Sequence, residues 1–279
     1  MSNAIPYFVL VAVCAIAFSI LLFHKRAVWP LILLLSFSGM IYMFEFYIFV
    51  WQDSYSYSPE LLDNTYYDNV LGAVFSNLLA VPVAAAFIAI YRLSWQWIVG
   101  LSLAFGGVEW LFLRLGIYQH DWWRTGYTIV TLLIFFLFAR QWLVWLSRRS
   151  RAFHFVTLSM FAWSVVATLV FTLAVSGIRI YHIGLFADPY HDDIFFSAIY
   201  GFIKAIILSV AVTVTRNRWL RGSSLLLILL MHLVLMRLDI LKIMIPMWQY
   251  WLIYAPCCMF VLWLVAASDR KLELFRISH

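Results

Sequence analysis

The chain has 279 residues, of which 65% are hydrophobic and only 11% are Asp, Glu, Lys or Arg. A soluble domain carries about 25% charged residues. This chain has too few polar residues to cover the surface of a water-soluble fold, so a soluble globular protein is excluded. The formal net charge of +6 does not indicate nucleic-acid binding, because there is no soluble basic face. Long apolar segments instead predict an all-α, multi-pass membrane protein whose first partner is the lipid bilayer.

Segment length sets the number of predicted spans, since a hydrocarbon layer about 30 Å thick needs roughly 20 apolar residues per helix. The first apolar segment has no basic leader and no small-residue cleavage site, so we expect a retained span and not a signal peptide. The sequence predicts nine transmembrane helices, at residues 5–23, 28–50, 70–92, 95–118, 125–147, 152–177, 193–215, 219–241 and 247–267.

The distribution of charge predicts the orientation of these spans. Of the 19 basic residues, 12 fall on alternate connections or in the C-terminal tail, whereas 11 of the 13 acidic residues lie on the opposite side or in the outer parts of helices. We therefore expect a plasma-membrane protein with its N-terminus outside and its C-terminus in the cytoplasm. The 12 basic residues are Lys25, Arg26, Arg92, Arg148, Arg149, Arg151, Arg216, Arg218, Arg221, Arg270, Lys271 and Arg276.

An internal repeat is predicted by comparing the sequence with itself. A shift of four spans preserves the direction of each helix, so the repeat would be parallel. It predicts an extra helix at 1–27, a first four-helix repeat at 28–147, and a second repeat with a cytoplasmic tail at 148–279. Chance similarity between apolar segments is the alternative. A shift of 123 residues aligns Tyr67 with Tyr190, Asn69 with Asp192, Glu109 with His232, Arg114 with Arg237, Leu115 with Leu238, and Tyr127 with Tyr250.

A motif in the first half carries a family resemblance. It begins at Glu109-Trp110, continues through Gly116, Tyr118, His120 and Trp122, and runs into residues 123–127. The pattern resembles the shared core, E-W-x5-G-x-Y-x-[HN]-x-W, of small multi-pass membrane proteins of spore-forming Gram-positive bacteria. The resemblance covers about a third of the chain and implies a similar fold, without an established activity. In the second half, His232, Asp239 and Leu241 replace the acid, the glycine and the tyrosine.

Ionisable residues inside the predicted spans are the main candidates for function. Each costs at least about 2.5–3.5 kcal/mol to insert, so each needs a partner or a role. A spacing of five residues puts Glu109 and Arg114 on different helix faces, which excludes an i,i+4 pair. Buried ion pairs that fix helix register, such as Lys204 with Glu109 or Glu45, are one interpretation, and a ligand or transport path is the other. The candidate residues are Glu45, Glu109, Arg114, Lys204, His232 and Arg237.

The outer loops contain a second group of polar residues. Asp68, His191 and Asp192 would lie at the outer entrance, where the loop carboxylates would raise the local cation concentration, although a simply solvated acidic loop has the same composition. His182, Asp188, His191 and Asp193 are weak candidates for metal ligands, because their spacing matches no tight ligand pattern. We predict no cofactor. Gly106 and Gly107, just before Glu109, would permit close helix approach.

These observations leave three hypotheses open. The first is a transporter-like or ligand-binding protein with an outward-facing polar cavity between two pseudo-symmetric halves, for a small-molecule, ion or lipid ligand. The second is an intramembrane enzyme acting on a lipid or lipid-linked substrate, with the group at Asp188 to Asp193 as acid/base residues or metal ligands. The third is a structural subunit of a membrane complex. The sequence contains none of the common hydrolase, P-loop or dinucleotide motifs, which weighs against an enzyme.

Overall fold

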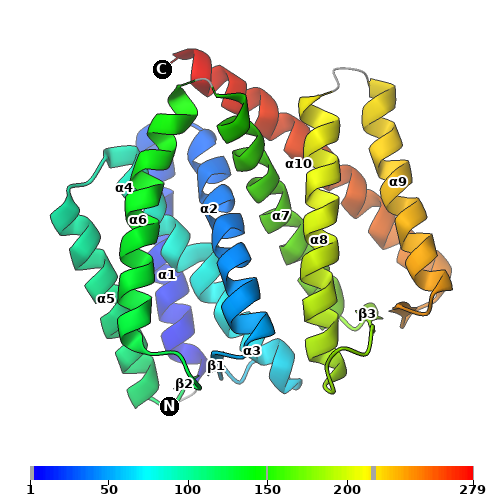
Figure 1. Ribbon diagram of the computed structural model, residues 1–279, viewed down its shortest axis with the longest axis horizontal. Helices are drawn as coiled ribbons and strands as arrows, with labels where there is room; N and C mark the ends of the chain where they lie inside the picture. The colour runs from blue at the N-terminus through cyan, green and yellow to red at the C-terminus, as the bar shows by residue number, and fades with distance from the viewer. Residues whose placement is uncertain (1–2, 149, 215–217, 279) are drawn as a thin grey trace. The chain divides into compact units, whose positions relative to one another are not determined.

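The computed structural model describes residues 3–148, 150–214 and 218–278 of the chain (Figure 1). Two of the basic residues used to predict the orientation, Arg149 and Arg216, lie outside the described residues, and so do the side chains of Arg218 and Arg276. The chain divides into two compact units, unit 1 at residues 1–150 and unit 2 at 151–278.

In its described residues, unit 1 contains five continuous helices and a two-stranded sheet. Two of the helices change from α- to π-helical geometry along their length, α2 into η1 and α3 through η2 into α4. Helix α6 packs against both α4 and α5, and α1 packs against η2. The elements are α1 (Ala4–Lys25), α2 (Trp29–Glu45), η1 (Phe46–Trp51), β1 (Tyr55–Tyr57), α3 (Thr65–Val74), η2 (Phe75–Ala80), α4 (Val81–Tyr91), α5 (Trp95–Arg114), β2 (Tyr118–His120) and α6 (Thr125–Ser147).

The part of unit 2 that the structure describes contains four helices and a second two-stranded sheet. Helices α7 and α8 pack closely along their length, and α10 contacts both of them. Pro256 lies inside α10, and the helix continues through it. The elements are α7 (Arg151–Val175), β3 (Arg179–Tyr181), α8 (Pro189–Thr213), α9 (Arg218–Arg237), β4 (Leu241–Ile243) and α10 (Met247–Ser278).

The predicted spans agree with the helices to within five residues at each end, except that α10 continues from the predicted end at residue 267 to Ser278. Within the described residues, eight helices are long and apolar enough to cross a membrane, so the structure supports a multi-pass membrane protein. The eighth predicted span, at 219–241, corresponds to α9, whose insertion in the membrane stays a prediction. The third begins earlier than predicted, at Thr65, because Asn64 caps the helix by accepting a hydrogen bond from the Tyr67 backbone N–H.

Each sheet joins two connections between helices, and both connections were expected to be separate loops. In unit 1, β1 and β2 pair antiparallel, with Tyr55 opposite His120 and Tyr57 opposite Tyr118. The chain turns from α5 into β2 at Gly116, whose positive φ of 71° favours glycine. In unit 2, β3 and β4 pair in the same way, and Asp239 makes the corresponding turn with φ 54°. Short strands of this kind were not predicted from the sequence.

The two π-helical segments have different neighbours in the sequence. Segment η2 comes immediately before Pro82, which is at the start of α4. A proline has no N–H to donate to the carbonyl four residues earlier, so the backbone before it is free to widen. Segment η1 begins directly after Glu45. π-Helical turns are frequent at functional sites, so both segments favour a functional site in the interior of unit 1.

Gly72 lets α3 approach the sheet of unit 1. A Cβ at this position would lie 2.4 Å from the Cβ of Tyr57, which is close to the backbone and cannot move aside freely. We therefore expect Gly72→Ala to destabilise the protein by about 1–3 kcal/mol through overpacking. Gly100→Ala, in α5, is the matched control, because nothing lies within 4 Å of its added Cβ. Thermal unfolding in detergent tests this, and equal midpoints for the two variants would contradict it.

Candidate functional site

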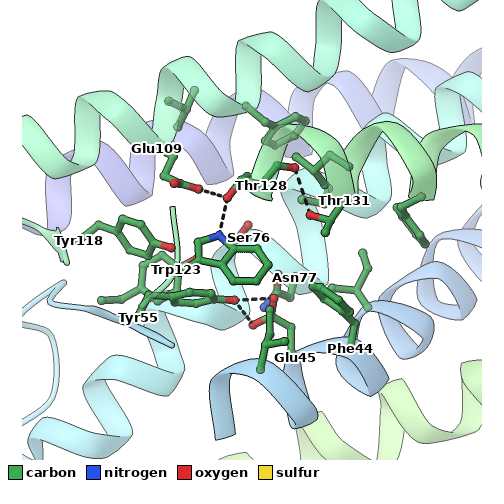
Figure 2. Close-up of a pocket in the computed structure, with 18 of the residues that line it drawn as sticks. Phe44, Glu45, Tyr55, Ser76, Asn77, Glu109, Tyr118, Trp123, Thr128 and Thr131 are labelled. Carbon is green, nitrogen blue, oxygen red and sulfur yellow. Dashed lines mark hydrogen bonds between the residues drawn. The ribbon is translucent and has the colours of Figure 1, made fainter. Parts of the chain in front are cut away.

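A cavity of about 430 Å³ lies inside unit 1 (Figure 2). Its walls come from most of the helices of the unit and from both strands, and they are largely apolar and aromatic. Two carboxyl side chains line it, Glu45 from the end of α2 and Glu109 from α5. Both were predicted as site residues from the sequence. The polar groups near them are Tyr55, Ser76, Asn77, Tyr118, Trp123, Thr128 and Thr131.

Glu45 is held by neutral hydrogen-bond donors. The Tyr55 hydroxyl lies 2.7 Å from each of its two carboxylate oxygens, and the Asn77 side chain also hydrogen-bonds the carboxylate. Burial, together with the adjacent Glu45, holds the pKa of Tyr55 well above its ordinary value. The phenol therefore stays protonated at neutral pH and acts as the donor. Figure 2 shows this arrangement on one side of the cavity.

Glu109 is held by a chain of side chains from β2, α6 and the segment between them. The Trp123 indole N–H donates to the Thr128 hydroxyl at 2.7 Å. Because an indole nitrogen is only a donor, Thr128 is left to donate its proton to Glu109 Oε2, its second partner. His120 Nε2 lies 2.8 Å from Oε1 of the same carboxylate, and both side chains are largely buried.

The position of Glu109 depends on close packing of α5 against α6. A Cβ on Gly106, one turn before Glu109, would lie 2.6 Å from Ile129 Cγ1. Ile129 is next to Thr128, so the absence of a side chain at Gly106 permits the contact between Glu109 and Thr128. Gly107 faces open space. The predicted role for glycine in close helix approach is therefore confirmed for Gly106 and wrong for Gly107.

Aromatic rings form the wall nearest the sheet. The cross-strand pair Tyr57 and Tyr118 has ring centroids 4.8 Å apart. Tyr55 lies 5.3 Å from Tyr118 and 5.8 Å from Trp123. Burial raises the pKa of Tyr57 and of Tyr118 well above the ordinary value for tyrosine, so these side chains act as neutral rings and donors.

The predicted arginines are not among the residues that line this cavity. Arg114 and Arg237 are the last residues of α5 and α9, and both are exposed. The Arg114 guanidinium lies over the Trp110 ring, 5.1 Å from its centroid. Neither arginine lines the cavity of unit 1. The predicted ion pairs that would join residues of the two units stay predictions.

Lys204 and His232 lie in a filled interior in unit 2. The fully buried His232 hydrogen-bonds the Tyr250 hydroxyl through Nε2 and stacks on the Tyr254 ring at 4.0 Å. The Lys204 ammonium lies over the Tyr200 ring, 4.4 Å from its centroid, and 5.9 Å from that of Tyr254. The cavity beside Lys204 measures only about 30 Å³.

The expectation of solvated loop acids is wrong for Asp68, Asp192 and Asp193, which lie near the starts of α3 and α8 and are all buried. Asp68 accepts hydrogen bonds from the backbone N–H groups of residues 60, 61 and 62, and Asp192 accepts from those of residues 183–186. A carboxylate orders each loop because it supplies acceptors to several backbone donors at once. Loop composition alone did not distinguish this from solvation.

The remaining loop residues also have structural contacts. Asp188 caps α8 by accepting from the Tyr190 backbone N–H, and the buried His191 stacks on Phe186 at 3.7 Å. His182 Nδ1 lies 3.0 Å from Asp192 Oδ2. In the part of the chain that the structure describes, no three His, Cys, Asp or Glu side chains converge as a metal site would require.

Comparison with known proteins gives no relative from which a function could be transferred. No protein-family model matches the chain, and neither does any curated protein or solved structure. The resemblance to membrane proteins of spore-forming bacteria therefore stays a prediction. The sequence motif nevertheless contains Glu109, Tyr118 and His120, which the structure brings together. Tyr55, Asn77, Trp123 and Thr128 were not predicted as site residues.

Proposed function

We propose that this chain is a ligand-binding integral membrane protein of transporter-like type, and that its ligand occupies the cavity of unit 1. One observation carries the proposal: Glu45 and Glu109, two acidic residues in apolar helices, line a single cavity of about 430 Å³. That volume is within the range of about 300–1,000 Å³ typical of small-molecule sites, which are largely apolar with a few polar groups. The predicted cavity between two halves is not needed for this site.

We also propose that the two units derive from one repeated architecture, with α1 as the extra helix. Recurrent backbone contacts support this. The Tyr57 N–H donates to Asn69 Oδ1, and 124 residues later the Tyr181 N–H donates to Asp193 Oδ1. Asp68 and Asp192 order their loops at the same spacing. After η2 the spacing is 123, since Phe112 and Leu235 accept the equivalent hydrogen bonds.

The change of spacing by one residue has a structural counterpart. A π-helical turn accommodates one extra residue in a helix, and η2 lies between the part of unit 1 that follows the 124-residue spacing and the part that follows 123. The single shift of 123 used in the sequence comparison is therefore one residue short before η2, where these hydrogen bonds pair Asn69 with Asp193 and not with Asp192. In this proposal, η2 is a local change made in one repeat.

The orientation and membrane remain part of the proposal. The 12 basic residues on alternate connections and in the C-terminal tail support a plasma-membrane protein with its N-terminus outside and its C-terminus in the cytoplasm. In unit 1, Asn3 donates to the Ser58 carbonyl at 3.2 Å, which places the start of α1 at the β1–β2 end. With this orientation the sheet end of the cavity faces outward.

The enzyme and structural-subunit alternatives have no specific observation in their favour. The carboxylates that the enzyme hypothesis would use make structural contacts, Asp192 with backbone donors and Asp193 with Arg179. The cavity of unit 1, by contrast, is accounted for by the ligand-binding hypothesis. Ligand binding is therefore the function that the geometry supports best.

Filling the cavity tests the proposal. We expect Thr131→Trp, which adds an indole at the cavity wall, to abolish saturable binding of the probe that the wild-type chain binds. Three radiolabelled probes of one shape and different charge are used: benzyltrimethylammonium, neopentylbenzene and phenylmethanesulfonate. Binding to the full chain in nanodiscs is measured by equilibrium dialysis, with empty nanodiscs as the blank.

Thr172→Trp is the matched control. Thr172 is an exposed threonine of α7 that hydrogen-bonds its own helix, as Thr131 does in α6, but it does not line the cavity. The control should bind like the wild type. Saturable binding that survives Thr131→Trp, or no saturable binding of any probe to the wild type, would overturn the proposed function.

A further inference from the structure

We propose that the ligand of the unit 1 cavity is an organic cation, an amine or quaternary ammonium with an apolar body, whose charged group lies between Glu45 and Glu109. This inference rests on the proposed function and names the class of its ligand. Three independent features of the structure support it: the charge of the lining, the rings around the carboxylates, and the contrast with unit 2.

The charge of the lining favours a cation. Among the described residues that line the cavity, two are acidic and none is basic. Neutral groups hold Glu45, and the basic group that contacts Glu109 is His120, which approaches from β2 and does not itself line the cavity. A carboxylate in a low-dielectric interior is costly unless a positive charge compensates it. A cationic ligand supplies that charge, whereas an anion would add to the repulsion.

The aromatic wall favours a large, weakly hydrated cation over a metal ion. Ammonium groups are attracted to ring faces within about 6 Å of the centroid, and Tyr55, Tyr57, Tyr118 and Trp123 all line the cavity. Calcium requires 6–8 oxygen ligands at 2.3–2.6 Å, which a largely apolar lining does not offer. The volume and the rings are suited instead to an ammonium carrying an apolar body.

The edge of the cavity indicates how such a ligand would enter. Phe44 of α2 and Ile134 and Phe138 of α6 line the cavity, and each is also exposed on the surface of these apolar helices. Phe44 lies at the edge of the site in Figure 2. An amphiphilic cation could therefore enter with its apolar part in contact with these side chains, and place its charge at the carboxylates.

Unit 2 contains an internal counterpart of the proposed complex. At the spacing of 123 that follows η2, Val81 corresponds to Lys204. Val81 lines the open cavity of unit 1, whereas Lys204 is buried and its ammonium lies over two tyrosine rings. Unit 2 thus fills its interior with an ammonium of its own. Unit 1 has two carboxylates at its cavity and no lysine at the corresponding position, so the ligand would provide the ammonium group.

The three probes described above test the inference in the full chain. We expect benzyltrimethylammonium to bind the wild type at least tenfold more tightly than its neutral isostere neopentylbenzene, and phenylmethanesulfonate to bind no better than to empty nanodiscs. Equal binding of the cation and the neutral isostere, with both lost in Thr131→Trp, would overturn the cation inference and leave the proposed function standing. Binding that Thr131→Trp does not remove would overturn both.

A built-in ammonium provides the second test. We expect Val81→Lys to reproduce the Lys204 arrangement in unit 1 and to weaken benzyltrimethylammonium binding at least tenfold. Val81→Met, which has a similar length and no charge, is the matched control for the added bulk, and it should bind the cation at least tenfold more tightly than Val81→Lys. If Val81→Lys does not fold, the comparison of cation and neutral isostere on the wild type still decides the inference. A folded Val81→Lys that binds the cation as well as Val81→Met would overturn it.

Discussion

Replacing Asp193 with alanine is expected to destabilise the protein by about 3–5 kcal/mol, the cost of breaking a buried ion pair on one side. Arg179 and Asp193 form a salt bridge, and both side chains are almost completely buried. The guanidinium also donates to the Val170 carbonyl at 2.6 Å, and Asp193 accepts from the Tyr181 backbone N–H. Alanine would leave a buried guanidinium without its carboxylate.

Unit 1 provides the matched control for this prediction. The positions 124 residues before Arg179 and Asp193 hold Tyr55 and Asn69, a neutral pair in which Asn69 still accepts the backbone hydrogen bond. The double variant Arg179→Tyr, Asp193→Asn should therefore recover most of the stability that Asp193→Ala loses. Denaturant unfolding in mixed micelles measures the three free energies. An unchanged midpoint for Asp193→Ala would contradict the prediction.

Replacing both Glu45 and Glu109 with glutamine is expected to weaken benzyltrimethylammonium binding by a factor of about 100 or more. Losing one partner of a buried charge pair costs about 2–5 kcal/mol, and each 1.4 kcal/mol is a tenfold change in affinity. Glutamine retains an acceptor for the hydroxyls of Tyr55 and Thr128, so the fold should be preserved. Neopentylbenzene, which has no charge to lose, should bind the double variant at least as well as the wild type.

His232→Gln is the control that distinguishes a site formed by Glu45 and Glu109 alone from a site that also includes His232. In the proposed repeat His232 corresponds to Glu109, but it hydrogen-bonds Tyr250 and is not among the residues that line the unit 1 cavity. Its replacement should leave cation affinity within about threefold of the wild type. Loss of cation binding in His232→Gln, or full binding in the double glutamine variant, would contradict the assignment of the site to Glu45 and Glu109.

The sequence predicts the helices and the two central acids because both signals are local. An apolar segment of sufficient length identifies a span, and a carboxyl group inside one is costly wherever the helix packs. Glu45 and Glu109 could therefore be singled out from composition alone. Asp68 and Asp192 could not be interpreted in this way, because an acid in a polar segment has the same sequence signature whether water surrounds it or, as at the starts of α3 and α8, backbone N–H groups do.

The partners of the acids could not be predicted, since they depend on packing. Glu109 meets His120 and Thr128 only because β2 turns back at Gly116 and because Gly106 permits α5 to approach α6. Tyr55 reaches Glu45 because the chain leaves η1 and pairs as a strand with β2. Arg114 was grouped with these residues because it lies inside the predicted span at 95–118, but α5 ends at this residue, which leaves it exposed.

The position of a bound cation in a crystal is the most direct test of a binding site between Glu45 and Glu109. Crystals of the chain grown with 4-iodobenzyltrimethylammonium would give anomalous scattering from iodine and density for the ammonium group. We expect one ordered molecule in the unit 1 cavity, with its ammonium between Glu45 and Glu109 and within about 6 Å of the surrounding ring centroids. An ordered probe bound elsewhere, with this cavity empty, would contradict it.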